Sequence, residues 1–230
     1  MAKRISIINF KGGVGKTTIA AQAESLLIDC ENGANAVQGL ARTPYLATWL
    51  QMREWLIEIA GKGAGESKVV AIDTIDWMVQ RIIEYVISDL DGDQSLTNTL
   101  GKSHGGFMKG REVVQNIVYR ELLPMLNAIN NRGIGLLLLA HAKNEKSTNA
   151  EGIERKGAVP AIPEWIRPAF TEWVDAILYA RPERTLVTEC TNLIFAKNRY
   201  QFPAEMPLSW PAIAGEISSL SNTENSNGQS

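Results

Sequence analysis

A glycine-rich segment near the amino terminus combines the residue types that bind phosphate groups. It follows a short apolar run, residues 5–9, and precedes a predicted short helix, residues 17–23. Glycines let successive backbone N–H groups converge on phosphate oxygens without interference from Cβ atoms, and the following helix adds the positive end of its dipole. The sequence therefore predicts a P-loop that binds ATP through Lys11, Gly12, Gly13, Val14, Gly15, Lys16, Thr17 and Thr18.

Three side chains are predicted to act on the phosphates and on a magnesium ion. Lys16 should reach the β- and γ-phosphates, and the Thr17 hydroxyl should ligate Mg²⁺. Asp73 ends the apolar run 69–73, so its carboxylate would hold a water bound to the same ion. Asp73 could also cap the helix that is predicted to begin at Ile75, a frequent role for aspartate, and the two roles are compatible.

Glu31 and His141 are candidate catalytic residues together with Lys16. Glu31 comes just after the predicted strand 26–29, where a carboxylate beside the P-loop can orient and deprotonate water. The alternative is a solvated turn residue. His141 follows the most hydrophobic run, residues 135–140, and ligands bind at such strand ends in open α/β sheets. The alternative is a histidine at a sheet edge whose hydrogen bonds are satisfied within the fold.

The elements that position these residues alternate between strands and helices and then become mainly strands. This order predicts an α/β fold, a mostly parallel sheet flanked by helices, with antiparallel edge strands near the carboxyl terminus. Residues 1–214 form one predicted domain, and the Ser-, Asn-, Glu- and Gln-rich residues 215–230 a disordered tail. Strands are expected at 5–9, 26–29, 68–73, 135–140, 174–180, 186–190 and 193–196, and helices at 17–23, 48–60, 75–86 and 111–130.

Composition narrows the class of protein further. The 230 residues suffice for one sizeable domain, and the formal charge of −2 gives no general attraction to nucleic acid or anionic lipid. No apolar run reaches the roughly 18 residues that span a bilayer, and no signal peptide is recognisable. We therefore expect a cytoplasmic protein with no membrane partner. Cys30 and Cys190 lie in strand-like runs and are expected to be buried thiols.

The P-loop resembles the deviant loop of the ParA/MinD partition ATPases. In that family an extra lysine, at the position of Lys11, contacts phosphate across a dimer. The resemblance ends soon afterwards, because the first helix here is short and the second strand lacks the Asp-x-Asp-Pro-Gln element of that family. An ATP-dependent dimer that works as a partition switch is the alternative function.

The segment after the second strand is instead similar to the RecA superfamily, in which a glutamate at the position of Glu31 activates the attacking water. The strand ending in His141 resembles the one that carries a polar γ-phosphate sensor, and residues 143–163 occupy the position of the DNA-binding loop. Residues 197–200 are similar to a Lys-Asn-Arg-Phe element of RadA-like ATPases. In that element Lys197 and Arg199 would reach the nucleotide of a neighbouring subunit; alternatively they are surface charges.

Over residues 3–202 the pattern most resembles the small phage and mobile-element RecA-like ATPases of the Sak class, which are single-strand annealing or recombination proteins. The resemblance implies a RecA-like fold, ATP and Mg²⁺ as cofactors, a homo-oligomer, and single-stranded DNA as a partner. A phage recombination protein or single-strand binding protein would be a further partner.

Two polar segments, 89–110 and 143–163, are predicted to be long loops and are the candidate DNA contacts. The stretch from Lys143 to Arg167 is barely positive, so phosphate neutralisation alone would be weak. Its basic residues are Lys143, Lys146, Arg155, Lys156 and Arg167, and its acidic ones Glu145, Glu151, Glu154 and Glu164. The first carries several basic residues and Phe107, which could stack on a base. The alternative for both segments is a solvated loop without a ligand.

Overall fold

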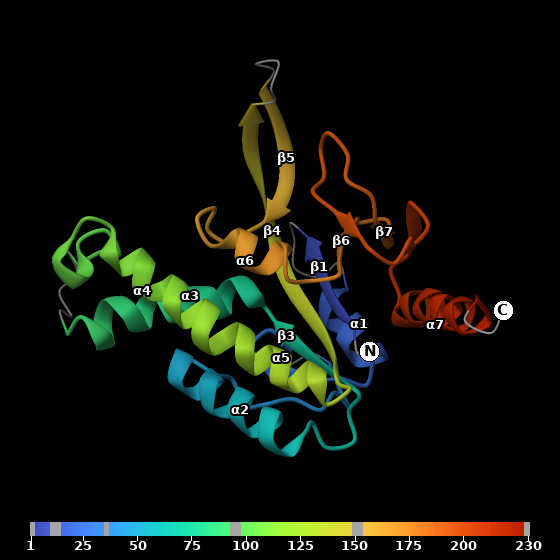
Figure 1. Cartoon of the computed structure of the whole chain (residues 1–230), viewed down its shortest axis with the longest axis horizontal. Helices are drawn as coiled ribbons and strands as arrows, with labels where there is room; N and C mark the ends of the chain where they lie inside the picture. Colours follow the sequence, from blue (N-terminus) through green and yellow to red (C-terminus); the bar gives the residue numbers. More distant parts are fainter. Residues whose placement is uncertain (1–2, 10–14, 35–36, 93–97, 149–153, 228–230) are drawn as a thin grey trace.

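The computed structural model describes residues 3–9, 15–34, 37–92, 98–148 and 154–227. A parallel sheet runs through its centre in the order β2–β3–β4–β1–β6 (Figure 1). The strands are β1 (Arg4–Asn9), β2 (Leu26–Asp29), β3 (Val69–Asp73), β4 (Gly135–Thr148) and β6 (Ala176–Ala180). Antiparallel strands extend the edge beyond β6: β7 (Thr185–Val187), β8 (Lys197–Asn198) and β9 (Glu205–Pro207). This confirms the predicted α/β architecture of a P-loop NTPase.

The position of β4 between β1 and β3 brings the predicted site residues to one edge of the sheet. Asp73 pairs with Leu139 in the parallel register of β3 with β4, and Asn9 pairs with His141 in that of β1 with β4. The carboxyl ends of these three strands therefore meet. Both faces of β4 are buried here, because Leu136 and Leu138 pack into one hydrophobic cluster while Leu137 and Leu139 pack into the other.

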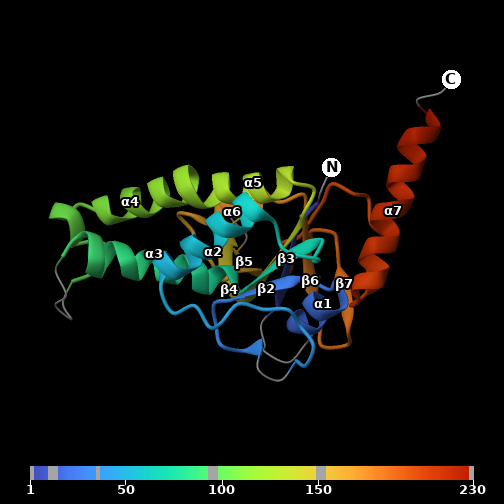
Figure 2. The ribbon, with the colours of Figure 1, turned by 90° about the horizontal axis from the view of Figure 1, so that it is seen from below.

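Helices cover the two faces of the sheet unequally (Figure 2). The larger cluster contains buried side chains of α2 (Trp49–Lys62), α3 (Ile75–Tyr85) and α5 (Leu123–Asn131). The smaller cluster lies under α1 (Lys16–Gln22) and α7 (Trp210–Asn227), which contribute Ile19 and Ile213. α2 begins at Thr48, whose side chain forms a capping box with Gln51. The predicted helix 48–60 is therefore confirmed to within two residues.

A helical arm extends from the body where the sequence predicts a helix at 111–130 (Figure 1). The arm consists of α4 (Lys109–Ile117), a π-helical turn (Val118–Leu122) and α5. The π turn ends two residues before Pro124, which has no N–H to donate to the preceding turn. A second π turn (Val86–Leu90) continues α3, and a short 3₁₀ helix (Ser103–Gly105) precedes α4. The predicted loop 89–110 is thus partly helical, and residues 93–97 lie outside the described residues.

The prediction that residues 143–163 form a loop is wrong. β4 continues to Thr148 and pairs with the antiparallel β5 (Glu154–Pro160), from Ala142 opposite Pro160 to Thr148 opposite Glu154. Figure 1 shows this hairpin projecting beyond the body of the molecule. A two-stranded ribbon away from the core does not need an apolar face, so its sequence lacks the alternation by which strands are recognised.

The carboxyl-terminal region also differs in part from expectation. α7 continues through much of the segment predicted to be a disordered tail, residues 215–230, and its Ile217 packs against the smaller cluster. The short helix α6 (Arg167–Thr171) lies between β5 and β6. Cys30 is buried as expected, whereas Cys190 is exposed because β7 ends at Val187. Among the described residues, no helix is long and apolar enough to cross a membrane.

Candidate nucleotide-binding site

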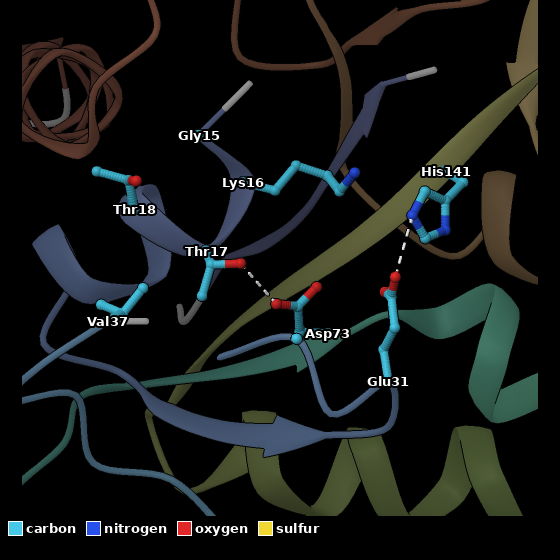
Figure 3. Close-up of a pocket in the computed structure, with 9 residues that line it drawn as sticks. Gly15, Lys16, Thr17, Thr18, Glu31, Val37, Asp73 and His141 are labelled. Atoms are coloured by element: carbon cyan, nitrogen blue, oxygen red, sulfur yellow. Dashed lines mark hydrogen bonds and ion pairs between the residues drawn. The ribbon is translucent and has the colours of Figure 1, made fainter. Parts of the chain in front are cut away.

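A pocket lies at the carboxyl edge of the parallel strands, and it gathers side chains from four separate segments of the chain (Figure 3). The start of α1, the turn after β2, the end of β3 and the middle of β4 each contribute. The lining residues are Gly15, Lys16, Thr17, Thr18, Glu31, Gly33, Val37, Asp73 and His141. Lys11, Gly12, Gly13 and Val14 lie outside the described residues. The structure therefore places the described P-loop residues, Glu31, Asp73 and His141 around one cavity.

Lys16 is the first residue of α1, directly after Gly15. Gly15 has a φ of 111°, a left-handed conformation that favours glycine, and its carbonyl accepts the N–H of Ile19. This turn directs Lys16 inward, where only 7% of its surface is exposed. Burial lowers the pKa of Lys16, while the carboxylates of Asp73 and Glu31 oppose that change. The two carboxylates thus favour the charged form of Lys16, and a charged ammonium group at the start of a helix can bind an anion such as phosphate.

The Thr17 hydroxyl donates a hydrogen bond of 2.8 Å to Oδ2 of Asp73, which joins α1 to the end of β3. Burial raises the pKa of Asp73, whereas the hydrogen bond from Thr17 and the charge of Lys16 lower it. The residue at the N-cap of α3 is Thr74, so Asp73 does not cap that helix. The Asp73 carboxylate is left to face the pocket.

Thr17 and Asp73 supply the hard oxygen atoms that Mg²⁺ prefers. The described part of the chain contains no cluster of three or more His, Cys, Asp or Glu residues placed to hold a metal ion. Such a cluster would form a cage made entirely of protein. One hydroxyl and one carboxylate are enough for an ion whose other ligands are water molecules and phosphate oxygens. Mg²⁺ is usually bound in this way at nucleotide sites.

Glu31 is carried on a tight turn that Asp29 organises. Asp29 is buried at the end of β2, and its Oδ1 accepts the backbone N–H groups of Glu31 (3.2 Å) and Asn32 (2.7 Å). The same aspartate donates its own backbone N–H to the Thr43 hydroxyl at 3.1 Å. The turn points the Glu31 side chain across the cavity (Figure 3). Burial raises the pKa of Glu31, and the charge of His141 opposes this shift.

His141 is fixed by Asp76, a residue that the sequence analysis did not single out. Oδ1 of Asp76 accepts the backbone N–H of His141 at 3.0 Å, and Oδ2 lies 2.9 Å from Nδ1 of the ring. Nε2 of the same ring lies 3.5 Å from Oε1 of Glu31. The pKa of His141 is raised, chiefly by the hydrogen bond to Asp76. Burial pushes the pKa of Asp76 upward, but its hydrogen bonds with His141 outweigh burial and lower it.

Lys197 and Arg199 lie outside this pocket, on and just after β8. Nζ of Lys197 donates to the carbonyls of Thr171 (2.9 Å), Glu172 (2.8 Å) and Val174 (2.6 Å), an arrangement that satisfies the carbonyls at the end of α6. Arg199 is more than half exposed and lies 3.7 Å from Asp175. The charged group of Arg199 is therefore more accessible than that of Lys197.

The comparison with known families agrees with this geometry. The sequence profile of the AAA domain family matches residues 3–200. The chain belongs to the AAA domain family. An AAA domain implies nucleotide binding and, in general, hydrolysis of the nucleotide, and the pocket described above is the candidate site for it. No curated protein gives a significant match to the chain.

Proposed function

We propose that this AAA-domain protein is a Mg²⁺-dependent ATPase that acts on single-stranded DNA during recombination or annealing in a phage or mobile element. The observation that carries the proposal is the position of Glu31 and His141. Both face Lys16, Thr17 and Asp73 across one cavity, and the hairpin continues β4 directly beyond His141.

In the proposed reaction, Glu31 orients and deprotonates the attacking water. A carboxylate whose pKa is raised by burial is a stronger base than an exposed one. Lys16 neutralises charge on the phosphates, and protonated His141 adds a second positive charge at the end of the pocket near Glu31. Bound Mg²⁺ would supply Lewis-acid stabilisation of the phosphate oxygens, held by Thr17 and Asp73.

For DNA, the hairpin and the tip of the helical arm offer two different kinds of contact. At the base of the hairpin, Glu145 lies beside Lys143 at 3.5 Å and pairs with Arg167, so charge there is partly neutralised. On the arm, Phe107 is 94% exposed, and a ring so exposed can stack on a base. Because each contact is weak alone, DNA affinity would depend on several subunits acting together.

The decisive experiment measures ATP hydrolysis by the purified protein with and without single-stranded DNA, with Lys16→Ala as the blank. We expect stimulation by DNA and no turnover in the blank. Glu31→Gln should lower turnover by about 10²- to 10⁴-fold while ATP still binds, because only the base is lost. Glu66→Gln, an exposed glutamate away from the pocket, is the matched control. Hydrolysis without DNA stimulation or DNA binding at low salt would remove the DNA role and leave the ATPase.

A further inference from the structure

The strand that leads to Glu31 is held on its outer side by a short segment of the chain. β2 is the outermost strand of the sheet, with β3 on its inner side. On the outer side, the Thr43 hydroxyl accepts the backbone N–H of Asp29 at 3.1 Å, and the N–H of Leu46 donates to the carbonyl of Asp29 at 3.0 Å. Thr43 and Leu46 are both buried. The segment 43–46 therefore fixes the residue whose carboxylate organises the Glu31 turn.

Tyr45 lies in the middle of this segment, and its side chain contacts α3. Tyr45 is 40% exposed, and its hydroxyl accepts a hydrogen bond of 3.1 Å from Nη2 of Arg81. Arg81 is itself held in place, because its Nη1 donates to Glu84 at 2.6 Å and its guanidinium carbon lies 5.1 Å from the centre of the Trp77 ring. A planar guanidinium with three such neighbours is a rigid connection between α3 and the segment.

The same helix carries Asp76, so the contacts form a closed chain that includes both candidate catalytic side chains. Asp76 binds the backbone N–H and the ring of His141, and Nε2 of that ring lies 3.5 Å from Oε1 of Glu31 (Figure 3). In the other direction, the connection from α3 through Arg81 and Tyr45 ends at the turn of Glu31. A shift of the Tyr45 segment relative to α3 therefore changes the separation between Glu31 and His141.

We propose that the hydrogen bond between Arg81 and Tyr45 positions Glu31 relative to His141 for hydrolysis. The inference deepens the proposed ATPase function and rests on it. Neither Arg81 nor Tyr45 is among the residues that line the pocket, so both are positioning residues that act through Glu31. Misplacing a catalytic group by about 1 Å can lower a rate by about 10²-fold. Because the loss of one hydrogen bond allows a smaller shift, we expect about a 10-fold loss of turnover.

Two substitutions break this hydrogen bond from its two sides. Tyr45→Phe removes the acceptor oxygen and keeps the ring, and Arg81→Met removes the donor. Each should lower kcat for ATP by about 10-fold with KM unchanged, and the double variant should be no slower than Arg81→Met alone, because both changes break the same bond. The matched controls are Tyr119→Phe, at an exposed tyrosine, and Arg53→Met, which removes a 2.7 Å pair with Glu121. Both controls should hydrolyse ATP as the wild type does.

Tyr45→Phe in the Glu31→Gln background separates positioning from general damage to the fold. If the hydrogen bond acts through Glu31, adding Tyr45→Phe to Glu31→Gln should cause no further loss of turnover. A similar loss in both backgrounds, or wild-type turnover by Tyr45→Phe alone, would overturn the inference. Failure of the proposed function has a different signature, because Glu31→Gln alone would then hydrolyse ATP as fast as the wild type, and the inference would fall with it.

Discussion

At the scale of single residues, the state of His141 is set by the two carboxylates on either side of its ring. Nδ1 lies 2.9 Å from Asp76 and Nε2 lies 3.5 Å from Glu31. A neutral imidazole has one N–H and can donate to only one of these groups, whereas the imidazolium donates to both. The raised pKa of His141 follows from this arrangement, with the hydrogen bond to Asp76 as its largest cause. The ring therefore stays protonated above the ordinary histidine pKa of about 6.5.

Asp76→Asn should remove most of that shift. In the proposed mechanism the rate of hydrolysis depends on protonated His141, so it should decline as the pH rises through the pKa of this histidine. Without the Asp76 carboxylate the pKa falls, and the decline should occur at lower pH. The measurement is kcat/KM for ATP against pH. Asp89→Asn, an exposed aspartate in the π turn that continues α3, is the control. If the decline of kcat/KM at high pH occurred at the same pH in both variants, the role assigned to His141 would be contradicted.

For Lys197, measurements of stability and of turnover distinguish a structural role from a catalytic one. Its ammonium group donates to three carbonyls at and after the end of α6, so Lys197→Ala should lower the free energy of unfolding by about 2 kcal/mol. Lys62→Ala, which removes an exposed pair with Glu58, should cost only about 0.5 kcal/mol. Urea denaturation measures both. Turnover per folded molecule should stay unchanged in Lys197→Ala; a loss of turnover at full stability would restore Lys197 as a catalytic group.

At the scale of elements, β4 connects the nucleotide pocket with the hairpin. Its buried part ends near Ala142, and the ribbon beyond leaves the core. Replacing residues 147–155 by a short Gly-Asn turn should therefore keep the fold and the basal ATPase rate, while stimulation by single-stranded DNA is lost. Phe107→Ala tests the other surface, with Tyr119→Ala as an exposed aromatic control. Stimulation that survives the hairpin exchange and fails in Phe107→Ala would assign DNA contact to the arm instead.

The same element shows how far sequence reasoning reaches. The run 135–140 is apolar throughout, so a central strand could be predicted from it, and His141 followed as a residue at the strand end. The hairpin could not be predicted, because a polar ribbon leaves no periodic signal. Asp76 was missed for another reason. Asp76 lies in the first turn of α3, where an acidic side chain is already explained by the helix dipole. Only the pairing of β3 with β4 brings Asp76 close to His141.

At the scale of the whole molecule, a homo-oligomer would let Arg199 of one copy complete the site of the next. Arg199 is exposed and lies outside the pocket of its own chain, so it can act on a nucleotide only if a neighbouring subunit presents one. Lys11 is the corresponding candidate for a partition-type dimer. Lys11→Ala would abolish ATP-dependent dimerisation in that case, whereas a RecA-like assembly need not depend on it.

Mixing two inactive variants tests the shared site directly. Arg199→Ala keeps Glu31 but lacks the arginine, and Glu31→Gln lacks the base but keeps Arg199. If Arg199 acts across the interface, a mixed assembly contains sites that combine Glu31 of one subunit with Arg199 of the next. Equal mixing should then restore turnover that neither variant shows alone, measured at concentrations where light scattering detects the assembly. Arg199→Ala with turnover equal to the wild type, or a mixture as inactive as its components, would show that Arg199 is a surface charge and that each chain holds a complete site.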